Sequence, residues 1–182
     1  MNATGNHSSF VTVLAWIFIV LSGFAAMISL LQNIMVWTMF NQPEIANAMA
    51  TPPPGSPPFM AFMTSYFRWF FLLFLLVTVA TLVSSIGLLK RLNWARLVFI
   101  GLMVLGIAWN LLGLLGQFAM MTFMRGQFAA MPKSPDMPDF QVFMTAMMAV
   151  TAIFAVGFSV LFGWIAKRLM SPRIRAEFGV PA

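Results

Sequence analysis

Long runs of apolar residues dominate this chain, and short segments between them hold nearly all of the charges. A helix needs roughly 20 apolar residues to cross the hydrocarbon core of a bilayer. Four runs exceed that length, and none carries an acid or a base in its central part. We therefore predict four transmembrane helices, over residues 10–40, 66–89, 94–124 and 140–166.

The segments between these runs predict how the chain is threaded. We expect loops at 41–65 and 125–139, a tight link at 90–93, and a tail at 167–182. Residues 51–58 read TPPPGSPP, and five prolines in eight residues predict a stiff polyproline II connector, with an aromatic-groove ligand as the alternative. The expected fold is an all-α, up-down-up-down four-helix transmembrane bundle, in a single membrane domain over residues 1–182.

The charges predict an orientation. An even number of spans separates the link from the tail, so both lie on one side of the membrane. Seven of the ten basic residues belong to that side: Lys90, Arg91, Arg96, Lys167, Arg168, Arg173 and Arg175. With Glu177 they carry the whole net charge of +6, while the other side sums to zero. The positive-inside rule makes the charged side cytoplasmic, so we expect both termini inside, with these side chains near lipid headgroups.

Composition supports a membrane protein and narrows the chemistry. The chain is 61% hydrophobic and 8% charged, whereas soluble domains carry about a quarter charged residues. The excess of basic residues flanks apolar runs, so it does not indicate nucleic-acid binding. Cysteine is absent and His7 is the single histidine, which removes the usual ligands of disulfide, haem and diiron sites. We expect no enzyme activity, no catalytic residues and no cofactor.

Small and polar residues recur along each run at spacings of three and four, as expected for helices that pack closely in lipid. The first run has Ala15, Ile19, Ser22, Ala26, Ser29 and Asn33. The fourth has Thr145, Ala149, Ala152, Val156, Ser159, Gly163 and Ala166. The strongest polar groups predicted at membrane depth are amides, at Asn33, Asn110 and Gln117. We expect these amides to form interhelical contacts, with Asn33 and Gln117 paired. A polar path or a headgroup site is the alternative.

Methionine is concentrated on the predicted outer side, which holds 13 of the 17 residues. Two groups lie where the third run ends and the fourth begins: Met120, Met121, Met124, Met144, Met147 and Met148. Thioethers bind Cu(I), so a soft-metal site is one interpretation. The others are a docking surface for a partner and plain packing, because methionine fills irregular gaps. No metal site is firmly predicted.

The tail predicts a short helix at the inner surface. Ser171 and Pro172 are typical of an N-cap and a first helical position. Ile174 and Phe178 would then lie against lipid, beside Arg173 and Arg175, which suit anionic headgroups.

The segment GLLKRLNWAR at 87–96 and the tail SPRIRAEF at 171–178 carry a resemblance to a known group. Both are similar to segments of small uncharacterised bacterial four-span inner-membrane proteins, in which a basic pair and W-A-R separate two hydrophobic helices. The resemblance implies a multi-pass protein of the bacterial inner (cytoplasmic) membrane, and implies no activity.

Three functions remain open from the sequence. The first is a non-enzymatic scaffold or accessory subunit of a larger membrane complex, bound to membrane lipids and to another membrane protein or to itself. The second is a Met-rich extracytoplasmic protein that binds Cu(I). The third is passive conduction of a small neutral solute along Asn110 and Gln117.

Overall fold

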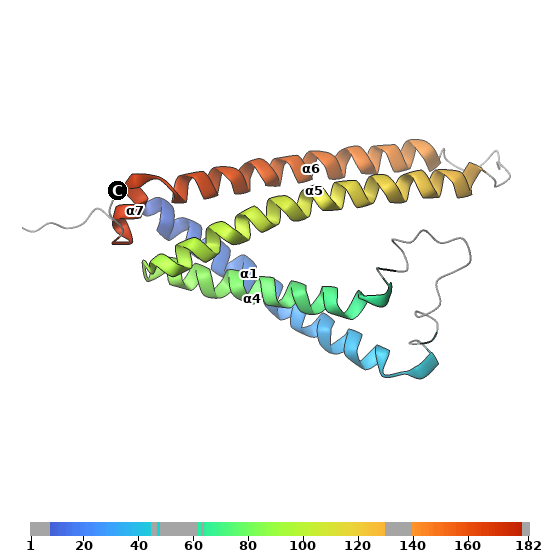
Figure 1. Ribbon diagram of the computed structural model, residues 1–182, viewed down its shortest axis with the longest axis horizontal. Coiled ribbons are helices and arrows are strands. Elements are labelled where there is room, and N and C mark those ends of the chain that lie inside the picture. Colours follow the sequence, from blue (N-terminus) through green and yellow to red (C-terminus); the bar gives the residue numbers. More distant parts are fainter. Residues whose placement is uncertain (1–7, 45–46, 48–61, 63, 130–139, 180–182) are drawn as a thin grey trace, which may run out of the picture. The chain divides into compact units, whose positions relative to one another are not determined.

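The computed structural model describes residues 8–44, 47, 62, 64–129 and 140–179 of the chain. Within this part it contains helices and no strand. The elements that form the fold are α1 (Ser9–Phe40), α4 (Phe67–Leu89), α5 (Asn93–Ala129), α6 (Phe140–Leu169) and α7 (Pro172–Glu177) (Figure 1). The proline segment at 51–58 lies outside the described residues.

Four of these helices, α1, α4, α5 and α6, are long and apolar enough to cross a membrane. The prediction of an all-α, multi-pass membrane fold is confirmed, and each helix begins within one residue of the expected position. The main difference is at the end of α5, which was expected at Met124 but continues through Arg125 to Ala129. The charge of Arg125 limits how far the apolar stretch can lie in lipid, but it does not end the helix, because the backbone hydrogen bonds of a helix also form in water.

The chain divides into two compact units. Unit 1 comprises Met1–Phe99 and Ser171–Ala182, and unit 2 comprises Ile100–Met170. Helix α5 therefore begins in unit 1 and continues through unit 2. We describe each unit by itself, and the expected single domain stays a prediction.

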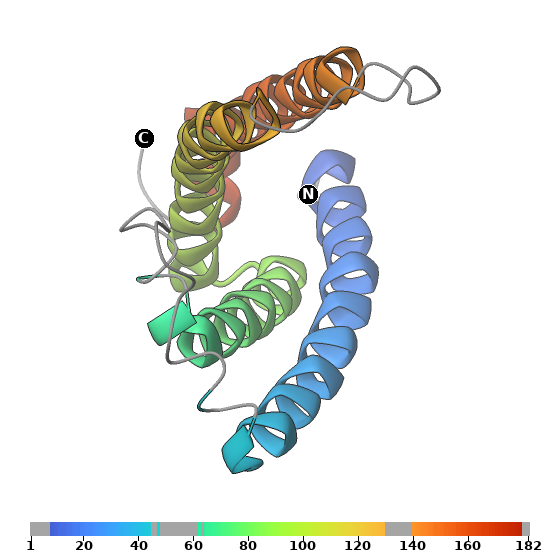
Figure 2. The same cartoon turned by 90° about the vertical axis from the view of Figure 1, so that its right-hand side faces the viewer.

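In unit 1, α1 and α4 lie side by side and run in opposite directions (Figure 1 and Figure 2). Near the end of α1, the rings of Phe40 and Phe67 stack with centroids 5.9 Å apart. The guanidinium of Arg68 lies over the ring of Trp37, 5.3 Å from its centroid. At the other end of the unit, the first turns of α5 pack against α1 through the buried side chain of Phe99, which meets Phe18 edge to face at 4.9 Å.

Small residues line the packed face of α1, as the sequence predicts. Ser22, Ser29 and Asn33 are buried, and Ile19 and Ala26 are partly buried. The serine hydroxyls donate to carbonyls of their own helix, for example Ser29 Oγ to Ala25 O at 2.6 Å. Each hydroxyl is thereby satisfied without a partner helix, so helices can approach closely at these positions.

In unit 2, α5 and α6 lie side by side (Figure 1 and Figure 2). Gly106 makes room for the ring of Phe162, because a Cβ at Gly106 would lie 2.9 Å from Phe162 Cε2. The expected seam of α6 is partly wrong, since Ala149 is exposed and the side chain of Val156 is 57% exposed. Four expected seam residues are partly or fully buried, Ala152, Ser159, Gly163 and Ala166, and so are their neighbours on the helix, Met148, Ala155 and Phe162. The packed face of α6 therefore includes a large ring beside the small residues from which we assigned the seam.

Candidate functional site

The turn between α4 and α5 is built around an arginine in an unusual backbone conformation. Arg91 has φ 55°, a left-handed region that residues other than glycine rarely adopt. The amide of Leu92 donates to Gly87 O at 3.0 Å, and that of Arg91 donates to Leu88 O at 3.1 Å. This pair of bonds defines a Schellman motif, which usually has glycine where Arg91 stands. Keeping arginine there costs about 1 kcal/mol of backbone strain, so its side chain must contribute something in return.

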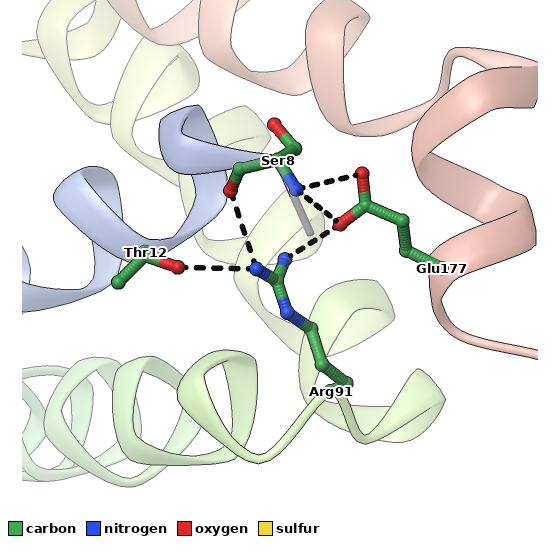
Figure 3. A network of polar contacts seen from close by, with 4 residues as sticks. All are labelled: Ser8, Thr12, Arg91 and Glu177. Atoms are coloured by element: carbon green, nitrogen blue, oxygen red, sulfur yellow. Dashed lines mark hydrogen bonds and ion pairs between the residues drawn. The ribbon is translucent and has the colours of Figure 1, made fainter. Parts of the chain in front are cut away.

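That side chain joins three segments that are far apart in sequence (Figure 3). Arg91 Nη1 lies 3.0 Å from Glu177 Oε2 in an ion pair, and both side chains are mostly buried, with 14% and 12% exposed. Nη2 of Arg91 donates to Ser8 O at 3.2 Å and to Thr12 Oγ1 at 3.1 Å.

Glu177 completes this network by capping the start of α1. The amide of Ser8 donates to both carboxylate oxygens of Glu177, at 3.2 and 3.1 Å (Figure 3). First-turn amides of a helix have no partner within the helix and favour a negative charge. One carboxylate therefore satisfies the start of α1 and balances the charge of Arg91. We call Ser8, Thr12, Arg91 and Glu177 the latch.

The latch brings the beginning of α1, the 90–93 link and α7 to the same end of unit 1. This agrees with the prediction that the amino terminus, the link and the tail share one side of the membrane. We call this the basic end of unit 1, and its basic residues are Lys90, Arg91, Arg96, Arg173 and Arg175. Lys90 and Arg173 are exposed there. Lys167 and Arg168, the other two predicted basic residues, are exposed in the last turn of α6 in unit 2.

Arg96 differs from the other basic residues because its side chain is only 5% exposed. Among the described residues, its Nε and Nη1 have no hydrogen-bond partner. Its guanidinium lies 5.7 Å from the ring centroid of Phe178, and that of Arg91 lies 5.9 Å from the same ring. Arg175 is close enough for its charge to repel that of Arg96.

The tail helix α7 forms as expected, but its apolar residues have different surroundings from those we expected. Ser171 precedes α7 in an extended conformation and Pro172 occupies the first turn, although the serine side chain makes no capping bond. Ile174 and Phe178 were expected to lie against lipid, and they are buried in the protein, at 4% and 7% exposure. The latch and the two guanidiniums over Phe178 explain the difference, because they hold this helix against the protein.

The three predicted amides have different surroundings. Asn33 is buried on α1, and its Nδ2 donates to Ser29 O of its own helix at 2.8 Å and to Phe71 O of α4 at 2.9 Å. Asn110 Nδ2 donates to Ser159 Oγ at 3.4 Å, which joins α5 to α6. Gln117 is partly exposed on α5. A pair between Asn33 and Gln117 would join the two units, and it stays a prediction.

The methionine cluster lies in unit 2. Met121 is buried, Met120, Met144 and Met148 are partly buried, and Met147 is 50% exposed. Met124 lies within α5, but its side chain is outside what the structure describes. Among the described residues, no group of three or more His, Cys, Asp or Glu could hold a metal ion.

Sequence reasoning missed the latch as a unit. It placed Arg91 at the link and counted Glu177 only as a charge, and it assigned no role to Ser8 or Thr12. One signal was present: Glu177 is the single acid on the side that carries seven bases. A lone carboxylate in such surroundings is expected to have a basic partner, but its identity depends on the fold.

Comparisons of the chain with protein-family models, curated proteins and solved structures found no match. The functional argument therefore depends on the residues and contacts described above.

Proposed function

We propose that this multi-pass membrane protein is a non-enzymatic scaffold or accessory subunit of a larger complex, acting by association within the bilayer. The observation that carries the proposal is the exposure of α6. This helix is long enough to span a membrane, yet no residue of its most apolar 18-residue window is buried inside the chain. The corresponding share is 22% for α1 and 28% for α4.

The exposed face of α6 has features that suit a second helix as well as lipid. At Gly157 an added Cβ would meet nothing within 4 Å. Glycine disfavours a helix in water by about 1 kcal/mol relative to alanine, but in membranes it lets another backbone approach closely. Thr151 is also exposed on α6, and its hydroxyl donates to Met147 O of the same helix at 2.9 Å. A partner helix could therefore pack here without leaving that hydroxyl unsatisfied.

The location belongs to the same proposal. The basic residues of the link and tail support a cytoplasmic location for that side by the positive-inside rule, with both termini inside. The similarity of the 87–96 and 171–178 segments to bacterial inner-membrane proteins supports the bacterial inner membrane as its site. A partner would then be another protein of that membrane or a second copy of this chain.

The test is native mass spectrometry of the tagged protein, expressed at its native level and released in a mild detergent. We expect a second polypeptide, or a second copy, at a fixed ratio. Gly157→Leu should lower the recovered complex about tenfold, because the added side chain keeps a partner helix at a distance. Val160→Leu is the matched control, since Val160 is exposed on the same helix and already bulky. Recovery of only a single protomer contradicts the proposal.

One observation favours Cu(I) binding as a second candidate function. From the Asn110–Ser159 contact, Met121 lies 11 residues further along α5 (110 to 121), and Met148 lies 11 residues back along α6 (159 to 148). Helices rise about 1.5 Å per residue, so two antiparallel helices bring these residues to the same level. Met144 is one turn further along the same face of α6.

If the protein binds Cu(I), the effect of replacing a methionine should depend on where that methionine lies. Replacing Met121, Met144 and Met148 by leucine should lower Cu(I) affinity at least tenfold in a competition titration with a Cu(I) chelator, because thioether ligands are lost. Met147→Leu is the control, since Met147 is exposed. Equal effects of the two changes would remove the copper interpretation and leave packing.

A further inference from the structure

The basic end of unit 1 contains one buried charge that no carboxylate of the described residues balances. Arg96 is 5% exposed, and its Nε and Nη1 have no partner among the described residues. A buried charge is stable only when it is paired and hydrogen-bonded. Without an anion, leaving the charge of Arg96 buried and unpaired would carry a large free-energy penalty.

The acid at this end is already engaged. Glu177 is 3.0 Å from Arg91 and accepts both of its hydrogen bonds from the amide of Ser8. The other acid of the described chain, Glu44, follows the far end of α1. At about 1.5 Å per residue, the 32 residues of α1 extend roughly 48 Å, so Glu44 is too distant to pair with Arg96. The described part of unit 1 thus supplies no carboxylate for Arg96.

The surroundings of Arg96 favour an anion over a neutral ligand. Arg91 and Arg96 share the ring of Phe178, at 5.9 and 5.7 Å, and Arg175 adds a third positive charge nearby. Glu177 pairs with Arg91. The guanidinium group binds phosphate strongly, because it is always charged and carries several donors in a fixed geometry.

The position of Arg96 in α5 indicates which phosphate reaches it. Arg96 lies one turn from the start of this spanning helix, and Trp94 beside it is exposed, as interfacial tryptophans are. Phosphate groups of phospholipids lie at this depth, and basic pockets at the cytoplasmic ends of spanning helices bind anionic headgroups.

We propose that Arg96, with Arg175 and the ring of Phe178, forms a binding site for one phosphate group, supplied by the headgroup of an anionic phospholipid. The site differs from diffuse attraction of basic residues to the membrane surface, because its central donor is buried and fixed by the fold. Binding also balances a charge beside the latch, since the lipid phosphate pairs with Arg96, whose Nε and Nη1 have no hydrogen-bond partner among the described residues. The inference concerns unit 1 and is independent of the association proposed for α6.

The experiment uses the full chain, delipidated in mild detergent and then supplied with phosphatidylglycerol, phosphatidylcholine or inorganic phosphate. Native mass spectrometry counts retained lipid, and tryptophan fluorescence follows thermal unfolding. We expect the wild-type protein to retain one phosphatidylglycerol, with a preference of about tenfold over phosphatidylcholine. Inorganic phosphate at millimolar concentration should raise Tm much less. An equal rise with inorganic phosphate, with no retained lipid, overturns the lipid source.

Two matched variants separate the site from the surface charge. Arg96→Gln and Arg173→Gln each remove one positive charge, but Arg173 is exposed on α7. We expect Arg96→Gln to abolish the preference for phosphatidylglycerol and Arg173→Gln to keep it. In phosphatidylcholine alone, Arg96→Gln should be at least as stable as wild type, because it removes an unpaired buried charge. Equal loss of preference in the two variants overturns the site, as does an equal loss of Tm by Arg96→Gln in both lipids.

A measurement on the wild-type protein keeps the proposal testable if Arg96→Gln does not fold. Phosphatidylglycerol with a photoreactive headgroup should crosslink to the 90–96 segment and to α7, as mapped by peptide mass spectrometry. Crosslinks at the same level on Lys167 and Arg168, exposed basic residues of α6 outside both segments, would show surface attraction alone and overturn the proposal.

Discussion

Unit 1 and unit 2 are both built from long apolar helices, but they hold those helices in different ways. Unit 1 closes one end with the latch and joins α1 to α4 with the bond from Asn33 to Phe71 O at 2.9 Å. In unit 2, the contacts between α5 and α6 include the hydrogen bond from Asn110 to Ser159 at 3.4 Å and the ring of Phe162 against Gly106.

One membrane protein can thus combine a unit held together by its own contacts with a unit whose helix surface is exposed for contact with lipid or another helix. In lipid, helices are not driven together by exclusion of water, so packing and hydrogen bonds must supply the attraction. Unit 1 joins its segments by internal hydrogen bonds, although Asn33 Oδ1, Asn93 Oδ1 and two nitrogens of Arg96 have no hydrogen-bond partner among the described residues. Unit 2 leaves most of α6 exposed, so its surface is open to lipid or to another helix. The predictions below test this contrast, beginning with the largest expected effect.

Breaking the latch should have the largest effect. Glu177→Ala leaves Arg91 without its counter-charge and the amide of Ser8 without its acceptor. We expect a loss of about 3 kcal/mol in the free energy of unfolding, at the low end for a buried ion pair because the site is partly exposed. Hydrogen exchange at the start of α1 and at α7 would report the loss. Glu44→Ala removes an exposed acid and serves as the control; an equal loss there would show that the latch has no special role.

Glycine substitutions test the packing of each unit. At Gly87 an added Cβ would clash with Ala95 Cβ, and alanine has no flexible side chain that could move away. We expect Gly87→Ala to cost about 2 kcal/mol by overpacking the α4–α5 turn. At Gly101 an added Cβ meets nothing within 4 Å, so Gly101→Ala should be neutral or slightly stabilising. Thermal unfolding in detergent measures both, and similar values would contradict the close contact at Gly87.

The two interhelical amides, Asn33 and Asn110, should show the smallest difference in the cost of substitution to the free energy of unfolding. Asn33→Leu removes a well-formed bond between α1 and α4 and should cost about 1 kcal/mol, whereas Asn110→Leu removes a long bond and should cost about 0.5 kcal/mol or less. Chemical denaturation in mixed micelles can resolve the two. A larger effect at Asn110 would mean that unit 2 is joined more firmly than its contacts indicate.

The sequence predicted the helices well because apolar length and charge position are local properties. The start of α4 was expected at Tyr66 and is at Phe67, and α6 begins at Phe140 as expected. The packed face of α1 was also predictable, since its serines and Asn33 recur on one side of the helix. The small residues of α1 pack directly against a neighbouring helix, as expected for small residues of helices that associate in lipid.

The remaining features depend on tertiary contacts. The packed face of α6 includes Phe162 because its ring fills the space at Gly106, and no pattern within α6 reveals what α5 presents to it. The burial of Phe178 and the strained backbone of Arg91 likewise follow from the latch, which joins segments distant in sequence. Because Glu177 is a lone acid in basic surroundings, the sequence indicated that it has a basic partner. Nothing in the sequence around Ser8 and Thr12 indicated their roles in the latch.

The separation of the latch residues has a consequence for synthesis. Ser8 and Glu177 are 169 residues apart in sequence, and at about 5–20 residues per second the ribosome needs roughly 8–30 s to make the chain between them. During that interval α1 and α4 are available to the insertion machinery, while Arg91 has no carboxylate to pair with. The latch therefore closes only after α7 has been translated. A chain that stops short of Glu177 therefore keeps Arg91 without the carboxylate that it pairs with in the folded protein, and the amide of Ser8 without its acceptor.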